Sequence, residues 1–255
     1  MKIGSYEILS KLGEGSFGRT FLAKHSLLGY KVVLKQEKTA DPPFMKLFEE
    51  EARMLQGMLH HGFPTLLDYF DTPDFGQVMA LNYIEGITGD KLKPVTDEHL
   101  CWILDRILQN LSYLHSHKKI IHCDLKPENI IINTKDHLVS IIDLGVSMGG
   151  IKATSKAKGG TQGFMPPEFE LGLPPVTSSD IYSVGKIAIA LTGGDVMAGE
   201  PPADMNGDLK KIIRQMLLRD PRQRPIDANQ LRGVFMDIRK KVWGRSATVE
   251  EIKYR

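Results

Sequence analysis

The sequence has little cysteine, little excess charge and no long apolar run. Its two cysteines, Cys101 and Cys123, do not suggest a disulfide framework, so a reducing, cytoplasmic compartment is expected. The 33 basic and 31 acidic side chains leave a net charge of +2, which gives no reason to expect nucleic acid or an anionic membrane as the main partner. The longest apolar stretch, 181–191, is interrupted by Lys186 and is too short to span a bilayer. We therefore expect a soluble chain without a membrane segment.

The hydrophobic pattern changes character near residue 84 of the 255-residue chain. Before that point it predicts mainly strands, with one amphipathic helix from Phe44 to Leu59. Beyond it, the spacing predicts mainly helices and one short strand pair. The expected strands are 6–9, 20–23, 30–35, 66–70, 77–83, 130–132 and 138–142, and the later expected helices are 97–114, 179–191, 209–218 and 228–242. A strand-rich front and a helix-rich back predict two lobes that meet near 82–86.

A glycine cluster, Gly13-Glu14-Gly15-Ser16-Phe17-Gly18, matches the pattern G-x-G-x-x-G. Taken alone, the cluster is equally well explained as a glycine-rich hairpin turn. A dinucleotide-binding fold would require a helix directly after the glycines, whereas 19–22 has the pattern of a strand. The context therefore favours a flexible hairpin, whose glycines let backbone N–H groups approach phosphates without a Cβ clash.

Lys35 ends an otherwise apolar strand, and Glu51 lies on the helix that follows this strand. Taken singly, each has an ordinary explanation. The lysine would be a strand-edge residue that reaches solvent, and the glutamate would be one solvated charge among its neighbours. An ion pair between them would instead hold the lysine where it can neutralise nucleotide phosphates. That interpretation depends on the motifs further along the chain.

Acidic and amide side chains mark two loops in the second part of the chain. Asp124 and Asn129 follow His122 on one loop, and Asp143 begins the triplet Asp-Leu-Gly after a predicted strand. Such residues also populate ordinary turns. Two carboxylates and a carboxamide that converge from loops suit Mg²⁺, which takes oxygen ligands and completes its shell with phosphate. The order of glycine flap, lysine, glutamate and two acidic loops favours this interpretation over a coincidence of turns.

Together these motifs resemble the protein kinase family over nearly the whole chain, from about Tyr6 to about Arg232. The matching segments are 122–129 for the catalytic loop H-R-D-L-K-P-E-N, 143–145 for D-F-G, 160–168 for the end of the activation segment, with Pro166 where A-P-E has alanine, and 179–185 for the buried central helix. These sequence motifs most resemble those of the eukaryotic-like (Hanks-type) serine/threonine kinases of bacteria.

The resemblance implies an α+β, bilobal fold that forms one protein kinase domain, 1–255. Residues 1–84 would form a small antiparallel sheet with one main helix, a hinge would lie near 82–86, and 87–255 would form a larger, mainly helical lobe. The implied activity is transfer of the γ-phosphoryl group of ATP, with Mg²⁺, to serine or threonine hydroxyls of protein substrates, including the chain itself. A monomer or a weak dimer is expected.

The resemblance also assigns the reacting groups. Asp124 would orient the substrate hydroxyl or accept its proton, and Lys126 would stabilise the transferred phosphoryl group. In this family, a lysine at the position of Lys126 and a threonine at that of Thr161 accompany serine/threonine kinases, so we expect a serine or threonine acceptor.

Nucleotide and metal would be bound by further matching residues. Asn129 and Asp143 would hold Mg²⁺, and Lys35, fixed by Glu51, would hold the α- and β-phosphates. The other residues expected to bind ATP are Leu12, Gly13, Gly15, Ser16, Phe17, Gly18, Thr20, Val33, Leu81 and Tyr83. The residues expected to support the loops and the activation segment are His122, Thr161, Glu168, Asp180 and Arg224, with Arg224 paired with Glu168.

Cys123 stands where the family usually has an arginine before the catalytic aspartate. In many relatives that arginine receives a phosphate on the activation loop, through charge-assisted bonds that cysteine cannot make. We therefore hypothesise that activity does not depend strictly on activation-loop phosphorylation, although Thr154 and Ser155 remain candidate autophosphorylation sites.

Two residues expected beside the adenine ring also depart from the pattern. Val33 stands where V-A-I-K has alanine, and Thr20 replaces a valine of nearly the same shape on the opposite face. The adenine pocket should therefore be narrower by two methyl groups.

Three other functions are compatible with parts of the pattern. A pseudokinase scaffold would lack the strand lysine, the catalytic aspartate or a metal ligand, and none of these is missing. A small-molecule phosphotransferase would lack the sequences found at 125–128 and 166–168. A recruitment module would use the basic tail 239–241 with Trp243, although a solvated last helix with one anchoring aromatic explains that tail more simply.

Overall fold

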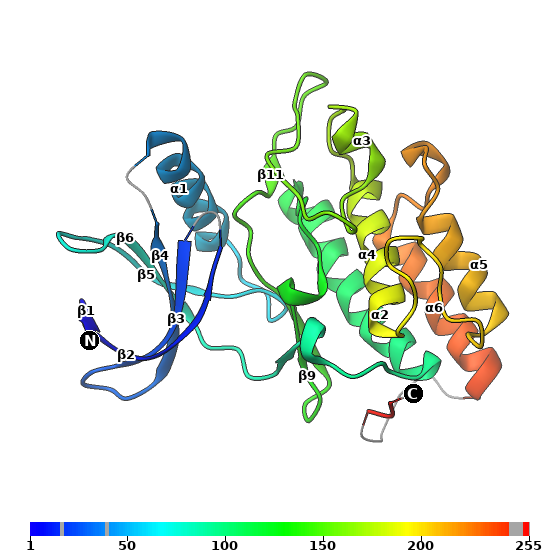
Figure 1. The fold of residues 1–255 in the computed structure, drawn as a ribbon, viewed down its shortest axis with the longest axis horizontal. Coiled ribbons are helices and arrows are strands. Elements are labelled where there is room, and N and C mark those ends of the chain that lie inside the picture. The colour runs from blue at the N-terminus through cyan, green and yellow to red at the C-terminus, as the bar shows by residue number, and fades with distance from the viewer. Residues whose placement is uncertain (16–17, 39–40, 245–251, 255) are drawn as a thin grey trace. The chain divides into compact units, whose positions relative to one another are not determined.

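The computed structural model describes residues 1–15, 18–38, 41–244 and 252–254. The chain forms two compact units, Met1–Glu85 and Gly86–Arg255 (Figure 1). Within the described ranges, the first unit contains one sheet and one helix, whereas the second contains the remaining helices and two small sheets. The α+β fold class predicted from the sequence is confirmed.

The first unit is built on one antiparallel sheet whose strands lie in the order β1-β2-β3-β4-β6-β5. The strands are β1 Lys2–Ile3, β2 Tyr6–Glu14, β3 Gly18–His25, β4 Lys31–Glu37, β5 Leu66–Thr72 and β6 Gly76–Asn82. Because successive residues of a strand point to opposite faces, the alternating apolar residues form a core on one face. This core consists of Ile3, Tyr6, Phe21, Ala23, Val32, Leu34, Val78 and Ala80.

Helix α1, Pro42–Gln56, covers the opposite face of this sheet at the position of Lys35. Its first positions are prolines, whose missing N–H would have no partner within the helix in any case. Its buried residues recur at helical spacing and are Phe48, Glu51, Ala52 and Leu55. The helix predicted from Phe44 to Leu59 therefore begins and ends earlier than expected, and Gly57 follows its last turn.

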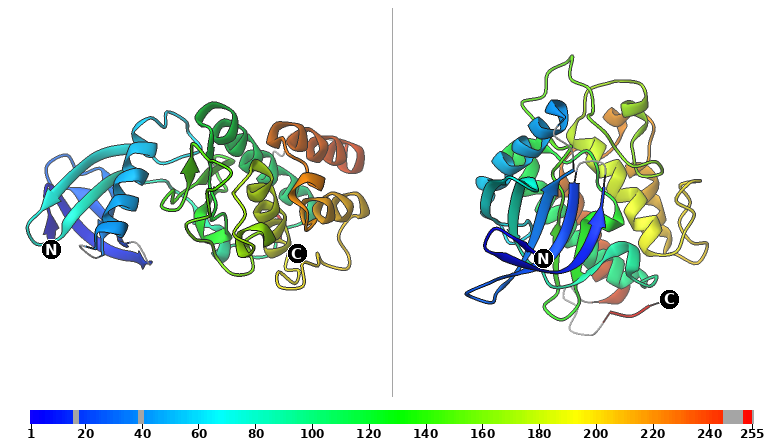
Figure 2. Two further views of the ribbon diagram at one scale, coloured as in Figure 1. Left: turned by 90° about the horizontal axis from the view of Figure 1, so that it is seen from above. Right: turned by 60° about the vertical axis from the view of Figure 1, so that its left-hand side comes forward.

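The second unit contains five α-helices within the described residues. They are α2 Asp97–Ser112, α3 Pro167–Glu170, α4 Thr177–Leu191, α5 Gly207–Met216 and α6 Ala228–Trp243. Helices α2 and α5 each pack against both α4 and α6 (Figure 2). Helix α4 is buried on nearly all sides, so the apolar run at 181–191 is a core helix. None of the helices in the described ranges combines the length and the apolar character needed to cross a membrane.

Two small sheets and several short helical turns lie between the helices of the second unit. A three-stranded sheet has the order β10-β9-β7, and a two-stranded one pairs β11 with β8. These strands are β7 Ile87–Thr88, β8 Ile120–Ile121, β9 Ile130–Asn133, β10 Leu138–Ile141 and β11 Met148–Gly149. Single 3₁₀ turns lie at Gly89–Lys91, Pro127–Asn129 and Pro221–Gln223, and a π-helical turn, Tyr113–Lys118, follows α2.

The last described residues return to the start of α2. Tyr254 forms an antiparallel bridge with Val95, and the Thr96 N–H donates a 3.0 Å hydrogen bond to the carbonyl oxygen of Lys253. Ile252 is buried in this contact region. The returning residues thus add an isolated β-bridge to the second unit, which the hydrophobic pattern did not predict.

Helix α6 differs from the solvated last helix expected from its basic residues. Arg239 is buried, with its Nη2 atom 3.6 Å from Glu98 Oε1 on α2. The expectation of a solvated helix anchored by one aromatic is therefore wrong at Arg239. The exposed basic residues of this stretch are Lys240 and Lys241.

Candidate active site

Lys35 and Glu51 form a two-armed ion pair in the first unit. Lys35 Nζ donates hydrogen bonds of 2.8 and 2.6 Å to Glu51 Oε1 and Oε2. The side chains are 11% and 3% exposed, so the pair is shielded from water. Losing one partner of such a pair leaves an uncompensated buried charge, which costs about 3–5 kcal/mol. The pair therefore fixes the lysine ammonium against α1.

The described glycines of the cluster lie where β2 ends and β3 begins. Gly13 pairs with Thr20 in the register of the two strands, and the Gly15 N–H donates a 2.9 Å hydrogen bond to the carbonyl oxygen of Gly18. A strand rather than a helix follows the glycines, which excludes the dinucleotide-binding arrangement. A Cβ atom on Gly18 would lie 2.5 Å from the carbonyl oxygen of Gln36, so glycine is required there. Two of the expected ATP-binding residues lie outside the described residues, namely Ser16 and Phe17.

Four of the residues expected to bind nucleotide share one face of the sheet. The register pairs Thr20 with Lys35 and Val33 with Leu81, and Val33 and Lys35 are alternate residues of β4. Their side chains therefore lie on the face opposite the apolar core. The other described residues expected in this group are Leu12 on β2 and Tyr83, which directly follows β6.

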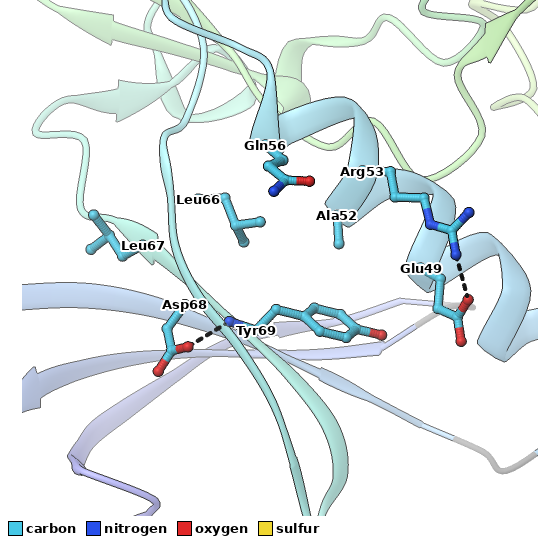
Figure 3. Close-up of a pocket in the computed structure, with 8 residues that line it drawn as sticks. All are labelled: Glu49, Ala52, Arg53, Gln56, Leu66, Leu67, Asp68 and Tyr69. Carbon is cyan, nitrogen blue, oxygen red and sulfur yellow. Dashed lines mark hydrogen bonds and ion pairs between the residues drawn. The ribbon is translucent and has the colours of Figure 1, made fainter.

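A cavity of about 580 Å³ lies in the first unit between α1 and β5 (Figure 3). The residues that line it are Glu49, Ala52, Arg53, Gln56, Leu66, Leu67, Asp68 and Tyr69. None of these is among the residues expected to bind ATP. The cavity lies on the sheet face that carries Lys35, because Tyr69 and Lys35 both pair with Met79, but it is lined by other residues than those expected to bind ATP.

In the second unit, Asp124, Lys126 and Thr161 form a closed triangle of contacts. Lys126 Nζ lies 2.9 Å from Asp124 Oδ2 and donates a 2.8 Å hydrogen bond to Thr161 Oγ1. The threonine hydroxyl in turn donates a 2.7 Å hydrogen bond to Asp124 Oδ1. Hydrogen bonds that involve charged groups are stronger than neutral ones. The triangle therefore holds a carboxylate, an ammonium and a hydroxyl in a defined geometry.

Asn129 and Asp143 provide oxygen atoms close to this triangle. Asn129 Nδ2 donates hydrogen bonds to Asp124, at 2.9 Å to the carbonyl oxygen and 3.4 Å to Oδ2, so its Oδ1 is the atom that can ligate a cation. The Ile142 N–H, next to Asp143, donates a 2.9 Å hydrogen bond to the carbonyl oxygen of Asn129. Asp143 has a left-handed backbone (φ 65°), which is unusual for a residue other than glycine and is often found at functional sites.

The oxygen donors in this region are of the types that bind Mg²⁺, although they are too few to complete its shell. Carboxylate and amide oxygens are the ligand types that Mg²⁺ prefers. Within the described ranges, no three histidine, cysteine, aspartate or glutamate side chains come together to hold a metal ion. Asn129 and Asp143 are thus suitable ligands for a cation whose remaining ligands come from outside the protein.

The loop that carries His122, Cys123 and Asp124 is anchored to α4 through Asp180, which is buried. Its carboxylate accepts hydrogen bonds from the N–H groups of His122 (2.9 Å) and Cys123 (3.0 Å) and contacts His115 Nε2 at 2.7 Å. Burial alone would raise the pKa of Asp180, but the hydrogen bond from His115 and the charges of the two histidines outweigh it and hold this pKa below its usual value. Asp180 therefore acts as an ionised anchor for the backbone before Asp124.

Cys123 takes part in this anchor through its backbone. Its φ is 68°, and its buried Sγ atom lies 3.5 Å from the carbonyl oxygen of Ile121. Burial, together with the charge of Asp180, raises the pKa of the thiol. The side chain is thus neutral and turned into the protein.

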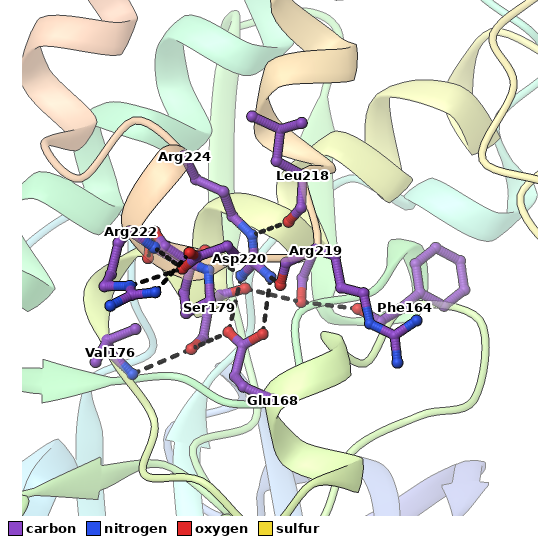
Figure 4. Close-up of polar contacts among 12 residues, drawn as sticks. Phe164, Glu168, Val176, Ser179, Leu218, Arg219, Asp220, Arg222 and Arg224 are labelled. Atoms are coloured by element: carbon purple, nitrogen blue, oxygen red, sulfur yellow. Dashed lines mark hydrogen bonds and ion pairs between the residues drawn. The ribbon is translucent and has the colours of Figure 1, made fainter.

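Glu168 and Arg224 form a bidentate ion pair at the end of the expected activation segment (Figure 4). The two bonds measure 2.7 and 2.8 Å, and both side chains are almost completely buried. Ser179 on α4 donates a further 2.7 Å hydrogen bond to Glu168 Oε1, and Arg224 Nε donates one of 2.6 Å to the carbonyl oxygen of Leu218. The pair thereby ties the segment that contains Glu168 to α4 and to the loop after α5.

Sequence reasoning did not identify two residues that complete these contacts. His115 reaches Asp180, and Ser179 reaches Glu168. Both side chains are buried in the structure, but the sequence offers little signal for either. Such residues are usually hydrogen-bonded, but their partners are not adjacent in the sequence.

Comparisons with known proteins agree with this arrangement. The family described as "Protein kinase domain" matches residues 6–236. "Serine/threonine-protein kinase D" of Synechocystis sp. is 38% identical over 199 residues, which cover 71% of this chain and 39% of that protein. "Serine/threonine-protein kinase PknA" of Nostoc sp. is 33% identical over 261 residues, which cover 89% of this chain and 46% of that protein. The chain thus spans less than half the length of these curated relatives.

Proposed function

We propose that this chain, which belongs to the protein kinase family, transfers the γ-phosphoryl group of ATP to serine or threonine hydroxyls of protein substrates. The observation that carries the proposal is the contact of Asp124 with Lys126 and with the Thr161 hydroxyl, at 2.9 and 2.7 Å. A carboxylate that can receive a hydroxyl proton, beside an ammonium that can neutralise phosphate, is the pairing that this reaction requires.

In the proposed reaction, the acceptor oxygen bonds to the γ-phosphorus while the bond from that phosphorus to the β–γ bridging oxygen breaks, and ADP leaves. Asp124 accepts the proton of the acceptor hydroxyl. Lys126 balances the charge that develops on the transferred group. Little covalent chemistry is left to the protein, so the rate depends on how well these two side chains are positioned.

The same proposal assigns the nucleotide contacts. Lys35, fixed by Glu51, neutralises the α- and β-phosphates, and the glycine hairpin covers them with its backbone N–H groups. Asn129 and Asp143 would hold Mg²⁺, which would supply positive charge to the phosphates. These assignments are supported by the matching positions in the family and by the oxygen donors described above.

We also propose that the chain phosphorylates itself. Thr154 and Ser155 lie in the segment between Asp143 and Glu168, and the Thr154 side chain is exposed. An exposed hydroxyl on this segment is accessible to a second copy of the chain. Phosphate mapping after incubation with ATP and Mg²⁺ tests this part separately from transfer to other proteins.

The proposed activity is tested with radiolabelled ATP and a general protein acceptor. The wild type should transfer label, and Asp124→Asn should reduce the rate at least about a hundredfold, because it removes the proton acceptor. Asp74→Asn is a suitable control, since Asp74 is an exposed residue of the first unit. Equal transfer by wild type and Asp124→Asn would reject the proposal, and so would the absence of transfer by either.

A further inference from the structure

Lys186 is buried in helix α4, where the neighbouring positions are apolar. The residue is 6% exposed, and its Nζ atom donates a 2.6 Å hydrogen bond to the carbonyl oxygen of Val196. Burial lowers the pKa of Lys186, while the charge of Asp195 acts in the opposite direction. Taking an ammonium group out of water is costly unless it is well bonded. A methionine could fill the same space without that cost, so packing alone does not explain a lysine here.

The acceptor of this hydrogen bond belongs to a closed loop, 195–200. The Asp195 N–H donates to the carbonyl oxygen of Glu200 at 2.9 Å, and the Glu200 N–H donates back to Asp195 at 3.0 Å. Gly199 has a left-handed backbone (φ 74°) that closes the turn. Lys186 therefore binds a loop whose own hydrogen bonds already define its shape.

This loop packs on the turn that carries Thr161. A Cβ atom on Gly163 would lie 3.2 Å from Met197 Sδ and 3.7 Å from Val196 Cγ1, so both loop side chains lie next to Gly163 and close off the space beside it. The same turn is closed by the Met165 N–H, which donates a 2.9 Å hydrogen bond to the carbonyl oxygen of Thr161. The loop that Lys186 holds thus contacts the turn 161–165, whose first residue binds Asp124.

Helix α4 holds this turn at a second point. Ser183, one helical turn before Lys186, donates a 2.9 Å hydrogen bond to the carbonyl oxygen of Phe164. The Tyr182 ring lies between the two anchoring regions, with Lys186 Nζ at 5.8 Å and Arg224 Cζ at 4.8 Å from its centroid. One face of α4 therefore holds the turn 161–165 directly, and also indirectly through the loop 195–200.

We propose that Lys186 is a positioning residue for the protein acceptor. By holding the loop 195–200 against Gly163, it keeps the turn 161–165 in the place where an acceptor peptide must pass to reach Asp124. The inference rests on the proposed phosphoryl transfer. It requires that loss of Lys186 weakens binding of the acceptor peptide, whereas ATP binding, which is assigned to other residues, is unchanged.

The test compares Lys186→Met with a matched control, Lys210→Met, in steady-state kinetics with a peptide acceptor. Lys210 Nζ also donates a 2.6 Å hydrogen bond to a backbone carbonyl, that of Ala203, but near the start of α5. We expect Lys186→Met to raise the KM for peptide about tenfold, the usual effect of losing one charged hydrogen bond. The KM for ATP, and both KM values of Lys210→Met, should change less than about twofold. An unchanged KM for peptide, or an equal rise in both KM values, would overturn the proposal.

A second variant, Met197→Ala, tests the proposal even if Lys186→Met does not fold. Met197 is 69% exposed, so Met197→Ala should fold normally while it removes part of the contact with Gly163. It should raise the KM for peptide in the same direction, whereas Leu59→Ala, at a similarly exposed residue, should not. If Lys186→Met does not fold, an unchanged KM in Met197→Ala decides against the proposal.

Hydrogen exchange separates this inference from the proposed function. Amides of 161–165 and 195–200 should exchange faster in Lys186→Met than in Lys210→Met, because the loop loses its buried anchor. Faster exchange in a protein whose wild type transfers no phosphate would reject only the proposed function. Equal exchange in the two variants would reject the positioning role, whatever the activity.

Discussion

The Thr161 hydroxyl donates a 2.7 Å hydrogen bond to Asp124 Oδ1, across 37 residues of sequence. Thr161 Oγ1 also accepts a 2.8 Å hydrogen bond from Lys126 Nζ. One threonine therefore orients both side chains that are proposed to act on the acceptor and the transferred group. Since small displacements of reacting groups can slow a reaction about a hundredfold, this contact should matter for the rate.

Replacement of Thr161 should reveal that contribution. Thr161→Val keeps the shape but removes the hydroxyl, and we expect kcat/KM for a peptide acceptor to fall about ten- to a hundredfold. Thr161→Ser keeps the hydroxyl and should stay within about threefold of the wild type. Steady-state kinetics of the three proteins provide the comparison. Thr161→Val with wild-type kinetics would contradict the orienting role.

The buried pair of Lys35 and Glu51 should show strong coupling. Lys35→Met or Glu51→Leu alone leaves one buried charge without its partner, and each should lower the free energy of unfolding by about 3–5 kcal/mol. The double variant removes both charges and should lose clearly less than the sum of the two. Urea unfolding of the four proteins gives the coupling energy, and strictly additive losses would be inconsistent with a buried pair.

The Glu168–Arg224 pair should stabilise the second unit through its geometry as well as its charge. Arg224→Lys keeps the charge but cannot make both bonds to Glu168, and we expect a loss of about 2 kcal/mol or more in unfolding free energy. Arg222→Lys is the matched control, because the Arg222 side chain is 88% exposed and its replacement should leave the stability almost unchanged. Thermal unfolding measures the stability of both variants. Equal losses in the two variants would argue against a stabilising role of the bidentate geometry.

The side chain of Val33 should not be required for ATP binding at the sheet face expected to bind nucleotide. It shares that face with Thr20, Lys35 and Leu81. At the position of Val33 the family usually has alanine, which is smaller. Overpacking of this kind can cost about 1–3 kcal/mol, so Val33→Ala should bind ATP as tightly as the wild type or more tightly. Calorimetric titration with ATP and Mg²⁺ decides the matter, and clearly weaker binding would show that the valine is useful.

Cys123 leads to a prediction about regulation. Its side chain is neutral and buried, so it cannot provide the charge that an arginine would offer to a phosphate. Treatment with a phosphatase should therefore leave most of the activity intact when the enzyme is assayed with a peptide. A large loss of activity after treatment, restored by incubation with ATP, would show that the hypothesis is wrong.

Motif order and spacing were sufficient to predict the family and the α+β fold, and both are confirmed. The pairing of Lys35 with Glu51 could be expected only with the support of the later motifs, because each residue taken singly has an ordinary explanation. The long-range pairing of Glu168 with Arg224 could be expected only through the resemblance. The structure contains both ion pairs, while their roles in the reaction remain proposals.

Other contacts depend on tertiary packing that the periodicity does not encode. His115 reaches Asp180 across 65 residues because a π-helical turn follows α2 and packs beside α4. The bridge between Val95 and Tyr254 joins two segments with no distinctive pattern. Lys186 interrupted an apolar run in the sequence, but only the position of the loop 195–200 indicates what its amine binds.

The most direct test of the central claim is analysis of the phosphorylated amino acids after transfer from radiolabelled ATP. Wild-type protein, incubated with ATP, Mg²⁺ and a general protein acceptor, should produce phosphoserine or phosphothreonine, and Asp124→Asn should produce almost none. Label confined to phosphotyrosine, or the same label with Asp124→Asn as with the wild type, would contradict the account.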